Sequence, residues 1–326
     1  MTRPSMSRNM AERMDLPFVG LATFAAQPAC TNWDKLDGAD VAVLGVPIDT
    51  ASSYRVGTRF GPRAIREMSM FHGFGPDGVF DFEDEVTYLT ADQVKIVDAG
   101  DSDVIYADTK RSLANAELAV RALLDAGTMP YILGGDHAIT MAMIAAYSDQ
   151  KPIQIVHLDA HFDFIDERNG ISWGHGSPMR RASEMAHVKG ITTVGPHNMA
   201  SVSRKDYEAA KAYGTHVVSM RKFRTIGAAA ALAHIPDRER VYVSIDIDSF
   251  DPSIAPGTAT ISHGGFNYYE AKDLLREVAT RFDVVGVDFV EVSPPYDPSG
   301  VTSLLAARTS LDFIGSIFHE RAKRRR

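Results

Sequence analysis

Short apolar runs alternate along the chain with stretches of helical periodicity, and this alternation constrains the fold more than any other feature. The runs are rich in Val, Ile and Leu and end near Gly, Pro, Ser or Asp, which is typical of strands. We expect strands at 41–49, 95–99, 129–133, 153–160, 191–195, 215–219, 241–246 and 284–290, with the clearest helices at 108–126, 268–281 and 303–322. Because the apolar runs are nearly continuous, both faces of a parallel sheet should be covered by helices.

The chain shows no internal repeat and no low-complexity linker that would divide it. We therefore predict one domain over residues 39–326, preceded by an irregular N-terminal extension over residues 1–38. Its aromatic residues Phe18, Phe24 and Trp33 are candidates for packing against a neighbouring subunit.

Composition excludes several classes of protein. The single cysteine, Cys30, rules out an intrachain disulfide and a cysteine-based zinc cluster, which favours a reducing compartment such as the cytoplasm. The 42 acidic and 34 basic residues give a net charge of −8, and no nucleic-acid motif is present, so we expect no nucleic-acid partner. No run approaches the roughly 18 apolar residues of a membrane span, so we expect no membrane partner.

The polar residues that follow four of the expected strands are of one chemical kind. They are Asp136 and His137 in GGDH, Asp159, His161 and Asp163 in DAHFD, Asp246, Asp248 and Asp251 in DIDSFDP, and Glu291 in EVSPP. Ligands collect beyond the carboxyl ends of parallel strands, so these side chains should meet. In an extended segment, residues two apart point to the same side, which predicts that Asp159, His161 and Asp163 face one way.

Four carboxylates that converge with two imidazoles would repel one another unless cations lay among them. Carboxylate and imidazole ligands without thiolate suit two ions such as Mn²⁺, Ni²⁺, Co²⁺ or Fe²⁺. Such a pair lowers the pKa of a shared water, so metal-assisted hydrolysis is the expected reaction class. Taken alone, each residue also has a simpler structural interpretation. His157 could be a core histidine and His137 a structural one, while Asp136 and Asp251 could be turn residues or neighbours of the ligands.

These motifs, with GTRFGPRAIRE at 57–67 and WGHGSP at 173–178, resemble the ureohydrolase (arginase/agmatinase) superfamily, and its agmatinase-type branch in particular. The resemblance runs from about residue 41 to the end of the chain. It implies a three-layer α/β/α sandwich around a mostly parallel sheet.

The resemblance also implies a ligand set and a reaction. One ion would be held by His137, Asp159, Asp163 and Asp246, and the other by His161, Asp159, Asp246 and Asp248. In the family, a metal-bridging hydroxide attacks a guanidinium carbon and yields urea and an amine. Asp163 is similar to the carboxylate that handles the proton, His175 to a mobile histidine that shuttles a proton or orients the substrate, and Glu291 to the glutamate that grips the guanidinium.

The sequence departs from the family pattern around the expected pocket. After DAHFD stand Phe164, Ile165, Asp166 and Glu167. Apolar and acidic residues are poor partners for a carboxylate, so arginine is an unsuitable substrate. With Phe164, Trp173 and His263 lining it, the pocket would suit a compact guanidino compound: guanidine, a guanidino acid, a guanylurea-like compound or a metformin-type biguanide. Mn²⁺ and Ni²⁺ both remain candidates, as do trimers or hexamers of like or related subunits.

Two other functions stay open. One is a non-catalytic subunit that partners a related active chain, although such a subunit would not need to keep all six ligands. The other is a deacylase on a similar scaffold, which would normally use one catalytic metal and not the full set of paired aspartates.

Overall fold

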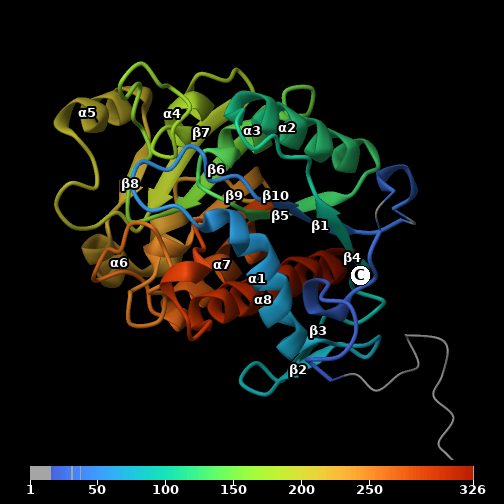
Figure 1. The fold of residues 1–326 in the computed structure, drawn as a ribbon. Helices are drawn as coiled ribbons and strands as arrows, with labels where there is room; N and C mark the ends of the chain where they lie inside the picture. The colour runs from blue at the N-terminus through green and yellow to red at the C-terminus, as the bar shows by residue number, and fades with distance from the viewer. Residues whose placement is uncertain (1–15, 31, 37, 326) are drawn as a thin grey trace, which may run out of the picture.

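The main sheet of the computed structural model, which describes residues 16–30, 32–36 and 38–325, has eight strands. They are β1 (Val41–Val46), β4 (Ile96–Asp101), β5 (Met129–Gly134), β6 (Ile153–Leu158), β7 (Val188–Val194), β8 (His216–Val218), β9 (Arg240–Asp246) and β10 (Asp283–Val290). Their order across the sheet is β4-β1-β5-β10-β9-β6-β7-β8 (Figure 1). Every neighbouring pair in the described sheet is parallel. The eight strands overlap the eight expected ranges.

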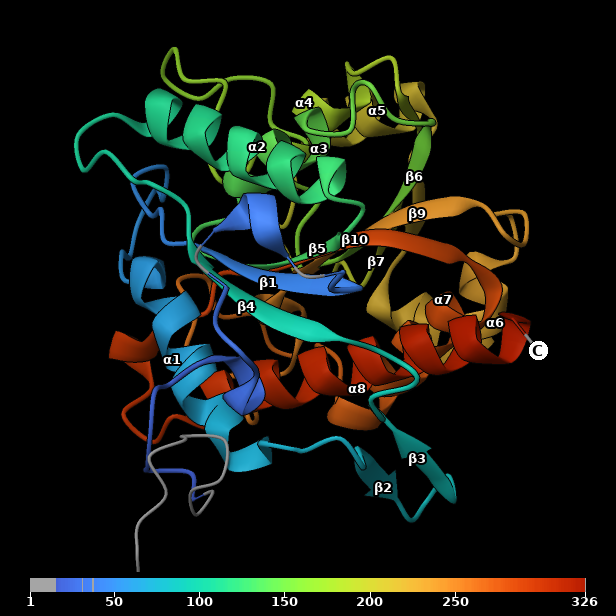
Figure 2. The same cartoon turned by 90° about the vertical axis from the view of Figure 1, so that its right-hand side faces the viewer.

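Helices cover both faces of this sheet and complete three layers (Figure 2). One face carries α2 (Thr109–Asp125), α3 (Ile139–Ala145), α4 (Pro178–Ser183) and α5 (Arg204–Tyr213); the other carries α1 (Gly61–Ser69), α6 (Met220–Leu232), α7 (Tyr268–Arg281) and α8 (Val301–Arg325). Alternate residues of β1 enter different cores: Val41 and Val43 join the α7/α8 side, and Ala42 and Leu44 join the α2/α3 side. This double burial explains the continuous apolar runs and confirms the α/β sandwich.

The segment before β1 packs partly on its own chain. Phe24 is fully buried in the core, and its N–H donates to Asp98 Oδ2 at 2.7 Å. Trp33 donates through Nε1 to the carbonyl of Ala99 at 2.9 Å. Of the three aromatic residues expected to face a neighbouring subunit, Phe18 is the one that stands open, with 84% of its surface exposed. Residues 1–15, 31 and 37, which belong to the same expected extension, lie outside the described residues.

Among the described helices, α8 is the one whose length and apolar composition would allow it to cross a membrane. However, 67% of its apolar window is buried inside the structure, where it packs against α1 and α7. Burial on several sides accounts for its apolar character. Its range contains the expected helix at 303–322, while α7 spans the expected 268–281 and begins with a capping box between Asn267 and Glu270.

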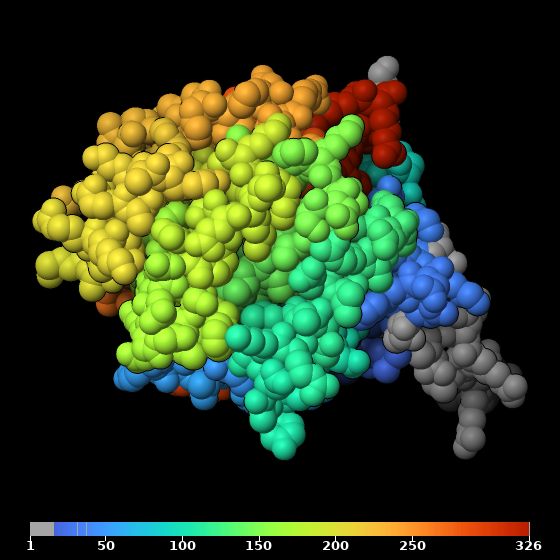
Figure 3. Space-filling view, turned by 90° about the horizontal axis from the view of Figure 1, so that it is seen from above, coloured from blue at the N-terminus to red at the C-terminus, as the bar shows by residue number. Residues whose placement is uncertain are grey.

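The sheet order places the site. Strands β5, β10, β9 and β6 lie side by side at the centre of the sheet, so their carboxyl ends meet at one edge. The loop after β5 passes against the loop after β1, where Asp136 N–H donates to Ile48 O at 2.7 Å. A Cβ at Gly135 would overlap that same carbonyl, so the second glycine of GGDH is needed for this close approach. Figure 3 shows the molecule from the side on which α2–α5 lie, where residues of about 100–230 make up most of the visible surface.

Candidate metal centre

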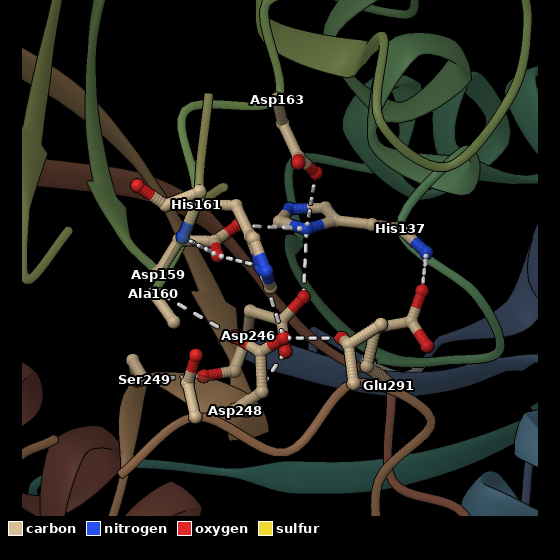
Figure 4. A network of polar contacts seen from close by, with 12 residues as sticks. His137, Asp159, Ala160, His161, Asp163, Asp246, Asp248, Ser249 and Glu291 are labelled. Atoms are coloured by element: carbon tan, nitrogen blue, oxygen red, sulfur yellow. Dashed lines mark hydrogen bonds and ion pairs between the residues drawn. The ribbon is translucent and has the colours of Figure 1, made fainter. Parts of the chain in front are cut away.

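The polar residues from the four central strands converge on one space (Figure 4). His137 lies three residues beyond β5, Asp159 directly follows β6, Asp246 ends β9, and Glu291 directly follows β10. Each of these four side chains is buried. The convergence expected from the strand-end pattern is therefore present.

His137 faces three carboxylates at once. Its Nδ1 lies 2.9 Å from Asp246 Oδ2, 3.0 Å from Asp163 Oδ2 and 3.2 Å from Asp159 Oδ2. A single nitrogen carries at most one proton, so it cannot satisfy three carboxylate oxygens by hydrogen bonding.

His161 makes the second group with the carboxylates on the other side of Asp159. Its Nδ1 lies 3.2 Å from Asp159 Oδ1 and 3.1 Å from Asp248 Oδ2. Two sets of potential ligand atoms therefore share Asp159: one with His137, His157 and Asp163, the other with His161 and Asp248. A carboxylate shared by two groups of potential ligands would suit a pair of divalent cations held close together.

The hydrogen bonds on the Nε2 side of the His137 ring show that the atoms grouped around Nδ1 fit a cation. Ser244 Oγ donates its proton to Asp288 Oδ1 at 2.7 Å, so it accepts from His137 Nε2, which lies 2.9 Å away. With the proton on Nε2, the lone pair of a neutral His137 lies on Nδ1 and faces carboxylate oxygens. That arrangement is repulsive unless a cation lies between them, and such outer contacts are typical of metal-bound histidines.

The electrostatics of the site agree with this fit. Although burial disfavours a charged ring, the Asp163, Asp159 and Asp246 carboxylates raise the pKa of His137 well above its ordinary value. For His161, burial is likewise outweighed, chiefly by Asp248 and then Asp159, and its pKa is also raised. Burial and the neighbouring Asp248 and Asp159 carboxylates raise the pKa of Asp246 well above its usual range. The cluster thus takes up positive charge, which divalent ions would supply.

The side chains converge for a different reason than the alternation of an extended strand. Strand β6 ends at Leu158, and Asp163 has a φ of 47°, in the left-handed region. Asp248 lies in a short 3-10 helix, Ile247–Ser249. The expectation that residues two apart in an extended segment share one side was therefore wrong, and turning backbone brings these carboxylates together instead.

Glu291 and His175 lie beside the cluster. Glu291 is buried with a φ of 64°, and its Oε1 accepts from the N–H of His137 at 2.9 Å and lies 3.3 Å from His175 Nδ1. Its other oxygen, Oε2, is buried without a hydrogen-bond partner in the described structure. A strained, buried carboxylate with a free oxygen is a candidate binding group.

A cavity of about 240 Å³ opens over these residues. Its lining includes His161, Asp163, Asp246, Asp248, His175 and Glu291. Phe164 lines it as expected, but Trp173 and His263 are not among the described residues of its wall. Trp173 instead stacks under Lys110, whose Nζ lies 3.9 Å from the ring centroid, and His263 lines a separate groove. The placement of Trp173 and His263 in this pocket was wrong: His175 and Thr260 from the same loops line it, but Trp173 and His263 do not.

The model of the arginase family matches residues 39–315. This chain belongs to the arginase family. It is 35% identical to a guanidinopropionase of Pseudomonas aeruginosa, over 91% of this chain and 92% of that protein, and 32% identical to an agmatinase of Bacillus anthracis, over 91% and 96%. The solved structure of proclavaminate amidinohydrolase from Streptomyces clavuligerus superposes with a TM-score of 0.82 at 32% identity, covering 94% of this chain and 99% of that one.

Family membership confirms the resemblance to the agmatinase-like branch, and it makes the chain an amidinohydrolase, which acts on C–N bonds other than peptide bonds. The family implies a site for two divalent ions. The candidate ligands are in the two groups that share Asp159, together with Asp246, whose Oδ2 lies 2.9 Å from His137 Nδ1.

Several residues around the site were not singled out from the sequence. Ser244 and Asp288 stand in strands that are otherwise apolar, and that interruption is the signal that could have revealed them. Thr260 donates to Asp248 Oδ2 at 2.7 Å, and Ser53 Oγ lies 2.8 Å from His175 Nε2. Their sequence surroundings give no comparable signal, because both lie in loops that only the fold brings to the site.

Three polar residues near the motifs were expected to have structural roles, and each has defined contacts in the structure. His157 is fully buried, as expected of a core histidine, and its Nε2 lies 2.8 Å from Asp159 Oδ2, so it also holds the shared carboxylate. Asp136 accepts from the N–H groups of Ala51 and Ala138, and burial together with Glu291 raises its pKa to about 7. Asp251 accepts from the backbone of its own turn.

Removing the metal ions should lower the melting temperature of the protein. Without cations the grouped carboxylates repel one another, whereas ions that bind the folded state stabilise it by about 2.7 kcal/mol per site at a hundredfold excess over Kd. We expect chelation to lower the melting temperature by roughly 5 °C or more and re-addition of Mn²⁺ or Ni²⁺ to restore it. Equal melting temperatures with and without metal, measured by calorimetry, would contradict this.

Proposed function

We propose that this amidinohydrolase cleaves a C–N bond of a small guanidino compound and releases urea, or a urea derivative, and an amine. The observation that carries the proposal is the position of Glu291, a buried carboxylate with an unpartnered oxygen, in the wall of the cavity that also exposes the candidate metal ligands. A planar guanidinium donates parallel N–H bonds, and a carboxylate with a free oxygen is its natural acceptor.

Two divalent ions, Mn²⁺ or Ni²⁺, would be held by His137, Asp159, His161, Asp163, Asp246 and Asp248. When bound, such ions lower the pKa of a water toward neutrality and so make a nucleophile available at physiological pH. The oxygen and imidazole ligands suit either ion, and by the affinity order Ni²⁺ binds such ligands more tightly than Mn²⁺.

The chain's own groups would move the protons. The departing nitrogen must be protonated, because an amide anion is a poor leaving group. Asp163 lines the cavity beside the cluster and would carry a proton. For His175, burial disfavours the charged ring, but the Glu291 carboxylate raises its pKa to about 9. The N–H of Ser53 donates to His175 Nε2 at 3.2 Å and favours an unprotonated nitrogen there. These opposing influences suit a group that takes up and releases a proton.

Ser53→Ala should lower kcat by about tenfold with little change in KM, since loss of an orienting contact typically costs 10- to 100-fold in such sites. The substitution removes the hydroxyl that lies 2.8 Å from His175 Nε2 and leaves the backbone N–H in place. Steady-state kinetics over pH 6–10 would measure it, and Ser53→Thr, which keeps a hydroxyl, should retain most of the activity. An unchanged kcat and pH profile in Ser53→Ala would show that the hydroxyl does not position His175.

The size of the cavity limits the substrate. At about 240 Å³ it is smaller than the roughly 300–1,000 Å³ of pockets for drug-sized ligands, and Phe162, Phe164 and Ile165 form an apolar part of its wall. Guanidine, short guanidino acids, agmatine, guanylurea-like compounds and metformin-type biguanides are therefore the compounds to compare.

The test is urea or amine release from this panel by protein loaded separately with Mn²⁺ and Ni²⁺. We expect turnover of at least one guanidino compound. If the protein binds two ions per chain and releases neither urea nor amine from any of them, the proposal fails. Activity that appears only on mixing with a related subunit would favour the partner-subunit alternative, and turnover of acetyl-lysine substrates would favour the deacylase.

A further inference from the structure

We infer that Arg168 sets substrate specificity by binding a carboxylate at the end of the substrate remote from the guanidinium, so that the preferred compound is a short guanidino acid. The inference rests on the proposed function, since it takes the guanidinium to lie near Glu291. Arg168 lines the same cavity of about 240 Å³ as Glu291 and the candidate metal ligands.

The backbone at Arg168 is held by a tight hairpin. Arg168 and Ile171 exchange two backbone hydrogen bonds, of 2.9 and 3.0 Å, across a two-residue turn. The residues of that turn, Asn169 and Gly170, have φ values of 54° and 79°, as the Asn-Gly pair of a type I′ turn requires. Nearby, Ile165 N–H donates to Gly176 O at 2.9 Å and closes the base of the loop. The side chain therefore projects from a fixed point at the cavity.

The acidic residues that precede Arg168 are engaged elsewhere. Asp166 pairs with Arg181 at 2.7 Å, and Glu167 accepts from the N–H of Gly170 at 3.0 Å. Neither carboxylate is among the described residues that line the cavity. The expectation that Asp166 and Glu167 would disfavour a substrate carboxylate was therefore wrong, because neither residue lines the cavity, whereas Phe164 and Ile165 do.

Outside the metal-centre and guanidinium-binding groups, two ionic side chains line the cavity, Arg168 and Asp206. Asp206 accepts from Ser203 Oγ at 2.5 Å in the first turn of α5, where the helix dipole favours a negative charge. The guanidinium of Arg168 has no acidic or carbonyl partner within the described part of the chain. Of these two groups, Arg168 is the cation, and its guanidinium remains available to an anionic ligand.

The chemistry of an available guanidinium selects among substrates of equal length. It donates paired N–H bonds to a carboxylate and matches the geometry of that group better than a lysine would. It repels the ammonium of an agmatine-like substrate, and it has no charge interaction with a methyl group in the same place. Three four-carbon guanidines with different ends, 4-guanidinobutanoate, agmatine and butylguanidine, therefore separate the charge effect from substrate length.

The experiment measures kcat/KM of the metal-loaded enzyme for these three compounds in wild type, Arg168→Gln, Arg168→Lys and Arg168→Glu. We expect wild type to prefer the carboxylate. Arg168→Gln should lower kcat/KM for 4-guanidinobutanoate about tenfold, mainly through KM, and leave butylguanidine within about twofold. Arg168→Lys should retain part of the preference, and Arg168→Glu should shift it toward agmatine. The exposed Arg63, outside the cavity, provides a matched control as Arg63→Gln, which removes one positive charge without changing the preference.

The outcomes are distinguishable. Equal losses for all three substrates in Arg168→Gln, no loss for any, or a wild-type preference for agmatine would each overturn the role of Arg168 while leaving the proposed function intact. Activity on a biguanide or on guanidine alone, with none on 4-guanidinobutanoate, would also overturn it. Failure of the wild-type enzyme to act on any guanidino compound would instead refute the proposed function.

Discussion

Asp159→Asn should lower urea release by about 10³-fold or more and remove one or both ions from the metal centre. Asp159 is the carboxylate shared by both groups of potential ligands: Oδ2 lies 3.2 Å from His137 Nδ1, and Oδ1 lies 3.2 Å from His161 Nδ1. The amide has nearly the same shape but carries no charge, so it would hold divalent cations much more weakly. Losing one preorganised electrostatic group typically costs about 10²- to 10³-fold in rate, and we expect a loss at or beyond the upper end of that range because both ions depend on this residue.

Metal analysis and kinetics together check this prediction. The metal content should fall from about two ions per chain to one or none, alongside the loss of activity. Asp77→Asn is the matched control, since Asp77 is exposed and far along the chain from the cluster. Full metal content and near-normal turnover in Asp159→Asn would contradict the shared-ligand role, whatever the substrate.

Glu291→Gln should lower kcat/KM by about 10²- to 10³-fold without removing the metal ions. Breaking one half of a buried charge pair costs roughly 2–5 kcal/mol, or about 30- to 5,000-fold, and the expected loss lies within that span. The glutamine keeps an oxygen that accepts from the N–H of His137, now made at 2.9 Å by the carboxylate, so the backbone near the metal centre should persist. What is lost is the negative charge that would face a guanidinium.

Two measurements separate this effect from misfolding. Metal content and melting temperature should stay close to wild type, while both KM and kcat worsen. The charge of His175 should also respond, because Glu291 is what raises its pKa to about 9. The basic limb of the pH–rate profile should therefore move to lower pH in Glu291→Gln. A variant with normal kcat/KM would remove Glu291 from the site and, with it, the observation on which the proposed function depends.

The candidate ligands could be found from the sequence because they share one local signal. Each follows a recognisable apolar run. It is unusual for several such runs in one chain to be followed by the same two kinds of side chain, carboxylates and imidazoles. The same signal failed for the pocket wall. Trp173 and His263 are close in sequence to the site motifs, yet their loops direct them elsewhere, whereas Ser53 reaches His175 across 122 positions of the chain.

The sequence alone determined the parallel α/β architecture, the strand ends that carry the chemistry and the family, because apolar periodicity and short motifs are local properties of a chain. The tertiary structure decided which of these segments are neighbours: β5, β6, β9 and β10 become adjacent in the order β5-β10-β9-β6, which no local pattern specifies. It also decided which charged groups line the outer cavity: Arg168 does, whereas Asp166, which pairs with Arg181, and Glu167, which accepts from the N–H of Gly170, do not. Side-chain direction in loops depends on long-range packing, so only the fold decided which loop residues line the cavity.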